Sequence, residues 1–398
     1  MRARQHLASL ATMGVSIVFC LLLGEATLRI LKRDAAFQPD PNQFRSLLPG
    51  KDQAISIFET EDNLNGRSSQ IPERAIPAGT RHTNNLGLRM GEDVEPKVPG
   101  EHRVLLLGDS YTEALDVSYD HRFDGVAQDL LTQSDDGAWK DWRIINAGIL
   151  NGSPSQYLLM LRRLLPLVTP DLVIVVTGAN DLGDDVQLEN QYGFEVDEDG
   201  IPLHPARRTQ LWLIQKSFLL RYLYVFLERY TPDLHRKVLA GGAAPSTPPD
   251  WMSVSCRQTP EVTALFGVKT GRYLVELQEM AASAGARFGV LVIHYSYSFE
   301  DEPYYEPRFP GLRAKLAKAG CAEANALPYV ALVDGFLERQ SVPYRDTHAA
   351  FLAAKRETPS RKLWNYYDYH FSPAGHEIAG AELAALLREM RNQLAETP

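Results

Sequence analysis

Apolar residues in this chain gather in short runs, and between the runs lie longer segments in which they recur every three or four positions. Runs of strand length cover residues 104–107, 143–147, 172–177 and 288–293, with a weaker one at 329–333. Helical spacing covers residues 123–131, 155–165, 269–284 and 374–394. Strands that alternate with helices predict a mostly parallel sheet with helices on both faces. The pattern therefore indicates an α/β fold of three layers, an α/β/α sandwich.

The amino-terminal segment has the pattern of a membrane anchor. Two arginines precede an uncharged, mostly apolar run from Leu7 to Leu23, and three basic residues follow it before Asp34. A transmembrane helix needs about 17 to 25 apolar residues, whereas the core of a cleaved signal peptide has about 7 to 15. The run favours an uncleaved transmembrane helix within residues 1–34, with a cleaved signal peptide or a buried core helix as alternatives. Because basic residues flank both ends, charge alone barely decides the orientation.

Two further regions follow the anchor. Residues 35–100 are rich in Pro, Asn, Asp and Gln and show no sustained period, which indicates a stalk and leading loops. Residues 101–398 carry the strand and helix pattern, and residues at about 186–285, called the insertion below, separate the strand-like runs 172–177 and 288–293. The insertion contains a strongly apolar segment, residues 211–230. This segment predicts an additional core helix, or a lid or surface that touches a membrane or an acyl chain.

Composition narrows the range of partners and cofactors. The 398 residues carry a net charge of −9, and no long basic run appears after the first forty residues, so no nucleic-acid partner is expected. The chain has no H-E-x-x-H, no paired-cysteine spacing and no phosphate-binding glycine motif, so neither a metal nor a cofactor is implied. Cys20 lies in the apolar run, which leaves Cys256 and Cys321 to form a disulfide or to stay buried thiols. No feature predicts an oligomeric state.

Candidate chemistry begins where the first strand-like run ends. Gly-Asp-Ser-Tyr-Thr at residues 108–112 follows the predicted strand 104–107. A serine at the carboxyl end of a parallel strand faces the crevice where open α/β sheets bind ligands. Three more polar motifs follow: residues 146–148 with 152–153, residues 178–181, and residues 368–370 with 372–376. In this order the four motifs resemble the blocks of the SGNH (GDSL) hydrolases, whose fold is flavodoxin-like, and residues 84–89 resemble the lead-in of anchored bacterial members.

The resemblance implies a serine hydrolase with Ser110 as its nucleophile. A serine hydroxyl is unreactive at its own pKa, so His370 is expected to accept the proton and then deliver it to the leaving alkoxide. Asp368 is expected to orient His370, although many members place the acid three residues before the histidine, where this chain has Tyr367. Asp-Thr-His at residues 346–348 has the same Asp-x-His spacing and ranks behind, because it lacks the Ser-Pro-Ala-Gly-His sequel.

The same resemblance implies an oxyanion hole with three hydrogen-bond donors. They are the Ser110 N–H, the side-chain amide of Asn180, and the N–H of Gly152, with Gly148 as the alternative glycine. Loss of one such donor typically costs about 10²–10³ in turnover. Four other polar residues in or near the motifs are expected to be structural: Asp109, Asp181, His294 and His376.

The expected reaction is cleavage of an acyl ester, such as an acetyl ester, of an extracellular carbohydrate or lipid. An O-acyltransferase acting on an extracellular glycan uses the same acyl-enzyme and differs in whether water or a sugar hydroxyl completes the cycle. A catalytically inactive glycan-binding module is a third hypothesis. Resemblance to anchored, exported relatives predicts a catalytic domain in the periplasm or outside the cell, tethered by the amino-terminal helix.

Overall fold

The fold is given by a computed structural model that describes residues 16, 19–27, 52–56, 78–114, 117–134, 139–149, 152–192, 194–196, 202–205, 217, 219–220, 259–295, 299, 328–365 and 370–395. The chain falls into two compact units. The larger unit contains residues 46–190, 196–203 and 247–398. The smaller unit contains residues 1–45, 191–195 and 204–246.

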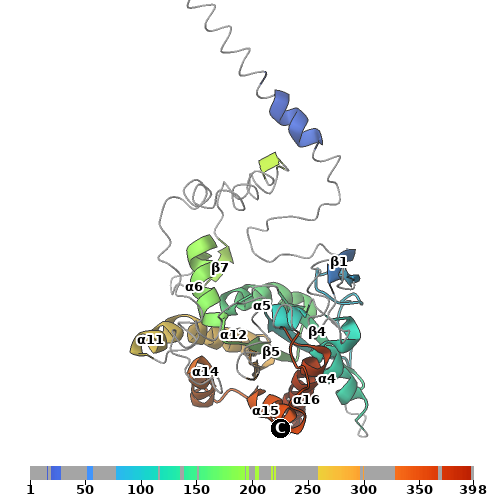
Figure 1. Cartoon of the computed structure of the whole chain (residues 1–398), viewed down its shortest axis with the longest axis vertical. Helices are drawn as coiled ribbons and strands as arrows, with labels where there is room; N and C mark the ends of the chain where they lie inside the picture. Colours follow the sequence, from blue (N-terminus) through green and yellow to red (C-terminus); the bar gives the residue numbers. More distant parts are fainter. Residues whose placement is uncertain are drawn as a thin grey trace, which may run out of the picture. The chain divides into compact units, whose positions relative to one another are not determined.

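Five parallel strands form the central sheet of the larger unit, in the order β4-β3-β5-β8-β9. Figure 1 labels β4 and β5 of this sheet. The strands are β3 (His102–Gly108), β4 (Trp142–Gly148), β5 (Leu172–Thr177), β8 (Arg287–Val292) and β9 (Tyr344–Asp346). Every residue of β5 is buried, and so is every residue of β3 after His102. Burial on both faces explains why these central strands have continuous apolar runs and no alternating pattern.

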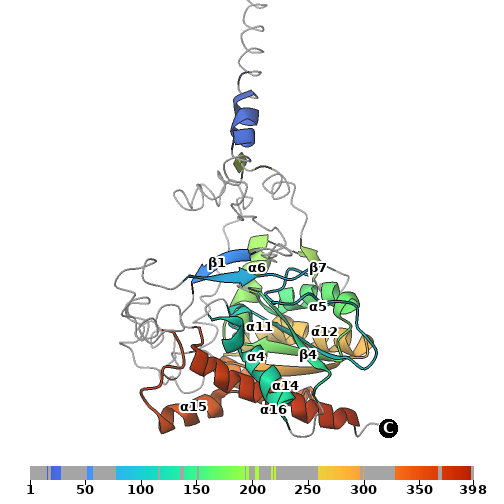
Figure 2. The same ribbon diagram turned by 90° about the vertical axis from the view of Figure 1, so that its right-hand side faces the viewer.

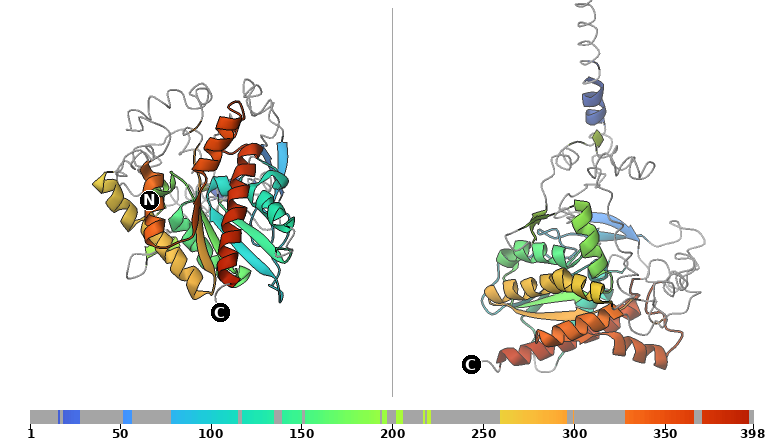
Figure 3. Two further views of the ribbon diagram at one scale, coloured as in Figure 1. Left: turned by 90° about the horizontal axis from the view of Figure 1, so that it is seen from below. Right: turned by 90° about the vertical axis from the view of Figure 1, so that its left-hand side faces the viewer.

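Helices cover both faces of the sheet (Figure 3). On one face α4 (Phe123–Thr132) packs against α16 (Pro373–Ala395), and on the other α5 (Pro154–Val168) packs against α12 (Thr270–Ser283). The predicted parallel α/β architecture is therefore confirmed. The remaining elements of this unit and its borders are α3 (Ser110–Glu113), a 3-10 turn (Tyr119–His121), α6 (Asp181–Tyr192), β6 (Phe194–Val196), β7 (Pro202–Pro205), α11 (Pro260–Val268), α14 (Pro328–Arg339) and α15 (His348–Glu357).

Four of the predicted strands and all four predicted helices match observed elements to within three residues at each end. The fifth predicted strand is wrong, because residues 329–333 belong to helix α14. A run of five apolar residues cannot distinguish a buried strand from the buried face of a helix. The fifth strand is instead β9, which has only three residues and carries Arg345 and Asp346. So short and polar a segment gives no strand pattern in the sequence.

The stretch expected to form a stalk and leading loops contains two short strands. β1 (Asp52–Ser56) pairs antiparallel with β2 (Ala78–His82) (Figure 2). After β2 the chain contributes to the core of the larger unit, since Leu88, Met90 and Val94 are buried. The lead-in to the first motif is therefore packed into the larger unit.

In the smaller unit, the described part of the amino-terminal segment is helical from residue 19 to residue 27. More than half of the surface is exposed on each of its large apolar residues Phe19, Leu21, Leu22 and Leu23. Glu25 on this helix accepts hydrogen bonds from Ser217 Oγ at 2.7 Å and from the Leu219 N–H at 2.9 Å, so part of the apolar segment of the insertion lies against it. No helix in the described part of the chain is both long and apolar enough to cross a membrane.

Several expectations fall on residues outside the described part of the chain. These are most of the apolar run, the pair Cys256 and Cys321, most of the insertion, and Asp368. They stay predictions.

The order of the strands reverses beside β3. The next strand in the sequence, β4, lies on one side of β3, and the later strands β5, β8 and β9 lie on the other. In open parallel sheets, the crevice at such a reversal, outside the carboxyl ends of the strands, is the usual ligand site. Ser110 follows β3 and Asn180 follows β5, so two residues of the predicted site flank this crevice.

Candidate active site

Ser110 begins helix α3 at the tight turn that follows β3. Gly108 is required in this turn, because a Cβ there would overlap the side chain of Thr112. Asp109 caps the helix, and its carboxylate accepts a hydrogen bond from the Tyr111 N–H at 2.9 Å. Asp109 and Tyr111 are buried, whereas Ser110 is partly exposed. The turn therefore presents the serine while its neighbours hold it.

Two buried side chains from elsewhere in the sequence hold α3 in place. Asn146, near the end of β4, donates from Nδ2 to the Thr112 carbonyl at 2.8 Å. Arg89, in the lead-in, donates to three carbonyl oxygens at and beyond the end of α3, those of Glu113, Ala114 and Val117. Burial, together with the nearby charge of Arg122, lowers the pKa of Arg89 to about 10, so it stays charged at neutral pH. Asn146 and Arg89 lie in segments whose sequence pattern is distinctive, residues 146–148 and 84–89. That pattern does not indicate that their side chains bond to carbonyl oxygens of α3 and the residues after it.

His370 reaches Ser110 from near the carboxyl end of the chain. Its Nε2 lies 2.7 Å from Ser110 Oγ, a hydrogen-bond distance. The ring of Tyr111 lies beside the imidazole, with the ring centroids 4.8 Å apart. The His370 carbonyl also accepts a hydrogen bond from the Asn365 N–H at 2.8 Å. Tyr111, the residue after Ser110, therefore places its aromatic ring against His370.

The alternative Asp-x-His sequence at residues 346–348 has a different arrangement. Asp346 Oδ1 lies 2.6 Å from His294 Nε2 and accepts a hydrogen bond from the His348 N–H at 2.7 Å. Burial opposes the ionisation of Asp346, but the hydrogen bond with His294 leaves its pKa below the ordinary value. His294 is itself buried, which fits its expected structural role. The imidazole partner of Asp346 is therefore His294.

His376, in the sequel to the histidine motif, is enclosed on α16. Its ring stacks on that of Phe123, with centroids 5.9 Å apart, and meets the Phe371 ring edge-on at 5.6 Å. Burial, together with the nearby charges of Arg122 and Arg89, lowers the pKa of His376 well below its ordinary value. It is therefore neutral at physiological pH, in keeping with a structural histidine.

Asn180 lies in the loop between β5 and α6. Its Nδ2 donates to two carboxylates, Asp184 Oδ2 at 2.7 Å and Asp109 Oδ2 at 3.2 Å. The second contact joins Asn180 to the residue that immediately precedes Ser110. The structure thus connects the first and third motifs through the amide expected to serve the oxyanion.

Asp181 holds the backbone of the same loop. It accepts hydrogen bonds from the Gly178 N–H at 3.0 Å, from Tyr157 Oη at 3.1 Å and from Thr177 Oγ1. Burial, reinforced by repulsion from Asp109, raises the pKa of Asp181 well above its ordinary value. The contacts agree with the local, loop-holding role expected for this residue.

The two glycines considered as the third oxyanion donor use their N–H groups within the protein. The Gly148 N–H donates to Asn146 Oδ1 at 2.9 Å, and the Gly152 N–H donates to the Ile149 carbonyl at 3.0 Å. Gly148 also packs closely on α3, where a Cβ would overlap the backbone of Glu113. Gly152 has only its turn hydrogen bond to exchange for one with a substrate, whereas Gly148 is held against α3.

Four carboxyl groups lie around the start of α6: Asp109, Asp181 and Asp185, which are buried, and Asp184, which is half-buried. Burial is the largest cause of a raised pKa in each of them. The pKa of Asp184 is raised to about 7 and that of Asp185 to about 6. Asp185 accepts hydrogen bonds from the Ser155 N–H at 2.9 Å and from Thr270 Oγ1 at 2.7 Å, and so ties α6 to α5 and α12.

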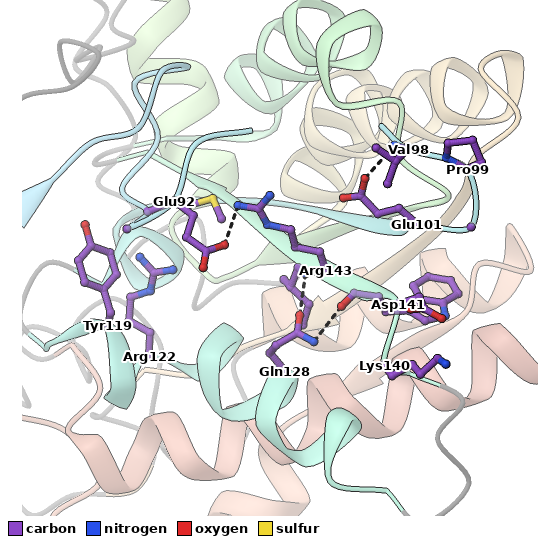
Figure 4. A pocket seen from close by; sticks show the side chains of 15 residues that line it. Glu92, Val98, Pro99, Glu101, Tyr119, Arg122, Gln128, Lys140, Asp141 and Arg143 are labelled. Carbon is purple, nitrogen blue, oxygen red and sulfur yellow. Dashed lines mark hydrogen bonds and ion pairs between the residues drawn. The ribbon is translucent and has the colours of Figure 1, made fainter. Parts of the chain in front are cut away.

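A surface pocket of about 730 Å³ lies away from Ser110 and His370, at the amino-terminal end of the edge strand β4 (Figure 4). Gln128 of α4 reaches into this region and bonds to the outer edge of the strand. Its Nε2 donates to the Trp142 carbonyl at 3.0 Å, and its Oε1 accepts from the Ile144 N–H at 2.8 Å. The residues that line the pocket include none of the predicted catalytic or oxyanion residues. The Ser110 and His370 pair lies at the carboxyl ends of the strands, where the parallel sheet places its crevice.

Comparisons with known proteins place the chain in a family. It matches the sequence model of the GDSL-like Lipase/Acylhydrolase family over residues 106–378, which is more than half of its length. It is similar to the solved structure of TesA, at 14% identity, with 72% of this chain and 99% of that chain covered and a TM-score of 0.36. It is also similar to the psychrotrophic esterase EstA from Pseudoalteromonas sp., at 12% identity, with 73% and 100% covered and a TM-score of 0.35.

A third similar structure is a catalytic mutant of an acetylxylan esterase from Geobacillus stearothermophilus, at 14% identity, with 73% of this chain and 96% of that chain covered and a TM-score of 0.33. A search of curated proteins gave no match. Ser110, Asn180 and His370 all lie within the residues matched by the family. The chain therefore belongs to the GDSL-like lipase/acylhydrolase family and is a serine-type carboxylic ester hydrolase.

Proposed function

We propose that Ser110 attacks the acyl carbon of an ester and that His370 acts as its base. The observation that carries this proposal is the 2.7 Å separation between His370 Nε2 and Ser110 Oγ. A neutral imidazole at this distance takes the hydroxyl proton during the attack and then gives it to the departing alkoxide. Water, activated by the same imidazole, hydrolyses the acyl-serine in the second half of the cycle. Asp368 orients His370 and stabilises the imidazolium.

Negative charge develops on the carbonyl oxygen during attack, and fixed donors stabilise it. The Ser110 N–H, at the start of α3, donates to no other residue in the described part of the chain, and it is the first proposed donor. The side-chain amide of Asn180 is the second. The Gly152 N–H is the third, once its turn hydrogen bond to Ile149 gives way to one with the substrate.

The proposed substrate is an acyl ester of a carbohydrate or lipid outside the cytoplasm, such as an acetyl ester. Family membership supports the ester chemistry. The extracytoplasmic source is inferred from the apolar amino-terminal run and from the lead-in at residues 84–89, which resembles that of anchored, exported relatives.

Replacement of the nucleophile tests the proposal. Ser110→Ala should lower turnover of p-nitrophenyl acetate by at least about 10⁴-fold, because the acyl-enzyme can no longer form. Its melting temperature should stay close to that of the wild type, since the side chain is small and the residue is partly exposed. Ser283→Ala is the matched control: in the described part of the chain this exposed hydroxyl bonds only to the Met280 carbonyl of its own helix, so turnover should stay unchanged. Substantial turnover by Ser110→Ala would show that another residue attacks the ester.

The same assay separates hydrolysis from acyl transfer. The wild-type protein is incubated with the ester in the presence and absence of a glycan acceptor, and free acetate and acetylated glycan are both measured. Free acetate as the main product in both cases identifies an esterase. Acetylated glycan formed at the expense of free acetate identifies an O-acyltransferase.

We also propose that the amino-terminal segment anchors the protein in a membrane, with the catalytic domain on the outer side. The uncharged run from Leu7 to Leu23 supports this, and so do the exposed apolar side chains of helix 19–27. The hydrogen bonds of Glu25 with Ser217 and Leu219 suggest that part of the insertion belongs to the same anchoring unit.

Reporter fusions test this topology. Alkaline phosphatase joined after Leu64 or after the last residue should be active, and a fluorescent protein that matures only in the cytoplasm should stay dark at both points. Deletion of residues 1–34 should release active enzyme from the membrane fraction. Bright fluorescence at both fusion points would place the catalytic domain in the cytoplasm.

A further inference from the structure

We infer that Asp184 is a positioning residue for this reaction: its carboxylate fixes the side-chain amide of Asn180 so that one N–H points toward the nucleophile turn. The inference rests on the proposed role of Asn180 as an oxyanion donor. Asp184 lies one helical turn after Asn180, on α6, and acts on the reaction only through that amide.

The hydrogen bonds of Asn180 divide its two amide protons between two carboxylates. The bond to Asp184 Oδ2 measures 2.7 Å and is the shorter one. The bond to Asp109 Oδ2 measures 3.2 Å and is the weaker one. Since Asp109 directly precedes Ser110, the proton on that side points to the end of the turn that carries the nucleophile. The long bond can be shared with a developing oxyanion while the short bond keeps the amide plane fixed.

The side-chain amide of Asn180 can gain a hydrogen bond by rotating by 180° when the side chain at position 184 is uncharged. Asn180 Oδ1 is buried and has no hydrogen-bond partner in the described part of the chain. It faces Gly178, where a Cβ would lie only 3.3 Å away. An ionised carboxylate only accepts hydrogen bonds, so it holds Nδ2 toward itself and excludes Oδ1. A neutral side chain at position 184 can also donate, and it would satisfy Oδ1 if the amide rotated by 180°. Nδ2 would then face Gly178 and no longer Asp109.

Electrostatic repulsion between Asp184 and the oxyanion would change the rate in the opposite direction. A negative charge close to the oxyanion repels it, so an ionised Asp184 could slow the reaction through simple electrostatics. Asp109 and Asp185 are the other carboxyl groups whose charges act on Asp184, and repulsion from Asp109 adds to burial in raising its pKa to about 7. The direction of the change in Asp184→Asn therefore decides between positioning and repulsion, because this substitution removes the charge and preserves the shape.

The test is a double-mutant cycle in the full-length protein, with p-nitrophenyl acetate as the probe. Asn180→Ala should lower kcat by about 10²–10³, as expected for the loss of one oxyanion donor. Asp184→Asn should lower kcat by about tenfold and change KM by less than about threefold, because the oxyanion contact is made in the transition state. The double variant should be no slower than Asn180→Ala, because Asp184 has no effect without the amide it holds.

The pH profile gives a readout that a merely structural role would not change. In the wild type, the acid slope of log(kcat/KM) should contain two parts: the fall caused by protonation of His370, and an added step of about tenfold where Asp184 is protonated. The step should disappear in Asp184→Asn, which makes the acid slope shallower over that range. Asp185→Asn is the matched control: it removes a neighbouring buried carboxylate that does not contact Asn180, and the step should remain.

The outcomes separate this inference from the proposed function. Ester turnover that survives Ser110→Ala, or a wild type that turns over no ester, would overturn both. If the Ser110 assay behaves as proposed, then a faster Asp184→Asn enzyme, additive losses in the double variant, or an unchanged acid slope would each overturn the role of Asp184 alone. Thermal melting of each variant shows whether a loss of activity reflects unfolding.

Discussion

Ser110, Asn180 and His370 are each partly exposed, while most of the residues that hold them are buried. Asp109 and Tyr111 are enclosed on either side of the serine, and Asp181 is enclosed beneath the asparagine loop. A hydrogen bond is stronger where water cannot compete for it. The buried residues therefore fix the geometry, and the three partly exposed side chains stay open to solvent.

We predict that Asp368 is the acid that orients His370. Asp368→Asn should lower kcat by about 10⁴, because a histidine without its carboxylate partner is held in the wrong tautomer. Asp346→Asn should change kcat by less than about threefold, since Asp346 is hydrogen-bonded to His294. Steady-state kinetics of both variants with p-nitrophenyl acetate make the measurement. If the two variants exchange behaviour, Asp346 is the acid.

Sequence motifs indicated the proposed catalytic residues more readily than the residues that support them. Ser110 and His370 are 260 positions apart, yet each lies in a recognisable local motif, and the structure brings them together. The roles of Asn146 and Arg89 depend on which distant carbonyl oxygens they meet, and no local pattern encodes that contact. Asp184 lies one helical turn beyond the motif at residues 178–181. Its contact with Asn180 depends on the formation of α6, which the motif does not indicate.

At the scale of elements, helix α3 is held by the lead-in segment through Arg89. Arg89→Met should lower the free energy of unfolding by at least about 3 kcal/mol, because it leaves the buried carbonyl oxygens of Glu113, Ala114 and Val117 without this donor and each such group costs about 1–3 kcal/mol. It should also lower kcat, since α3 carries Ser110, the proposed nucleophile. Urea denaturation makes the measurement.

Arg143→Met is the matched control for this prediction. Arg143 is partly exposed and bonds to the Asp93 carbonyl and to the exposed carboxylate of Glu92. Its loss should cost less than about 1 kcal/mol. Equal destabilisation by the two substitutions would mean that Arg89 contributes no more than a surface arginine.

Elements were predictable from sequence where they are long and buried. β3, β4, β5 and β8 each contain a run of apolar residues, and the helices α4, α5, α12 and α16 have a clear period. α14 begins with an apolar run that also fits a strand, and β9 is too short to show any period. In both cases long-range packing decides the structure, which the local pattern does not contain.

At the scale of the whole molecule, the buried carboxyl groups make stability depend on pH. Burial raises the pKa of Asp185 from 3.8 to about 6, so the folded state binds its proton more tightly than the unfolded state does. The contribution of this group to stability is therefore full below about pH 4 and is lost as the pH rises to about 6. Asp185→Asn cannot ionise and should remove this dependence.

The size of the effect follows from the shift in pKa. Since each pKa unit corresponds to about 1.4 kcal/mol, the difference in free energy of unfolding between the two proteins should move in favour of Asp185→Asn by on the order of 3 kcal/mol between pH 4 and pH 8. Urea denaturation of both proteins across this range makes the measurement. A difference that stays constant with pH would show that the folded protein does not shift the pKa of Asp185.

The contact of Gln128 with the edge strand β4 has a consequence for aggregation of the protein during storage. An uncovered strand edge is a template on which other copies of a chain can pair. Gln128 closes part of this edge with one amide, which donates to the Trp142 carbonyl and accepts from the Ile144 N–H. Deamidation would leave a glutamate that can still accept but, once ionised, can no longer donate. Deamidation of Gln128 alone would thus leave the Trp142 carbonyl on the sheet edge without its donor. Aggregates that grow in stored protein should be enriched in chains deamidated at this position.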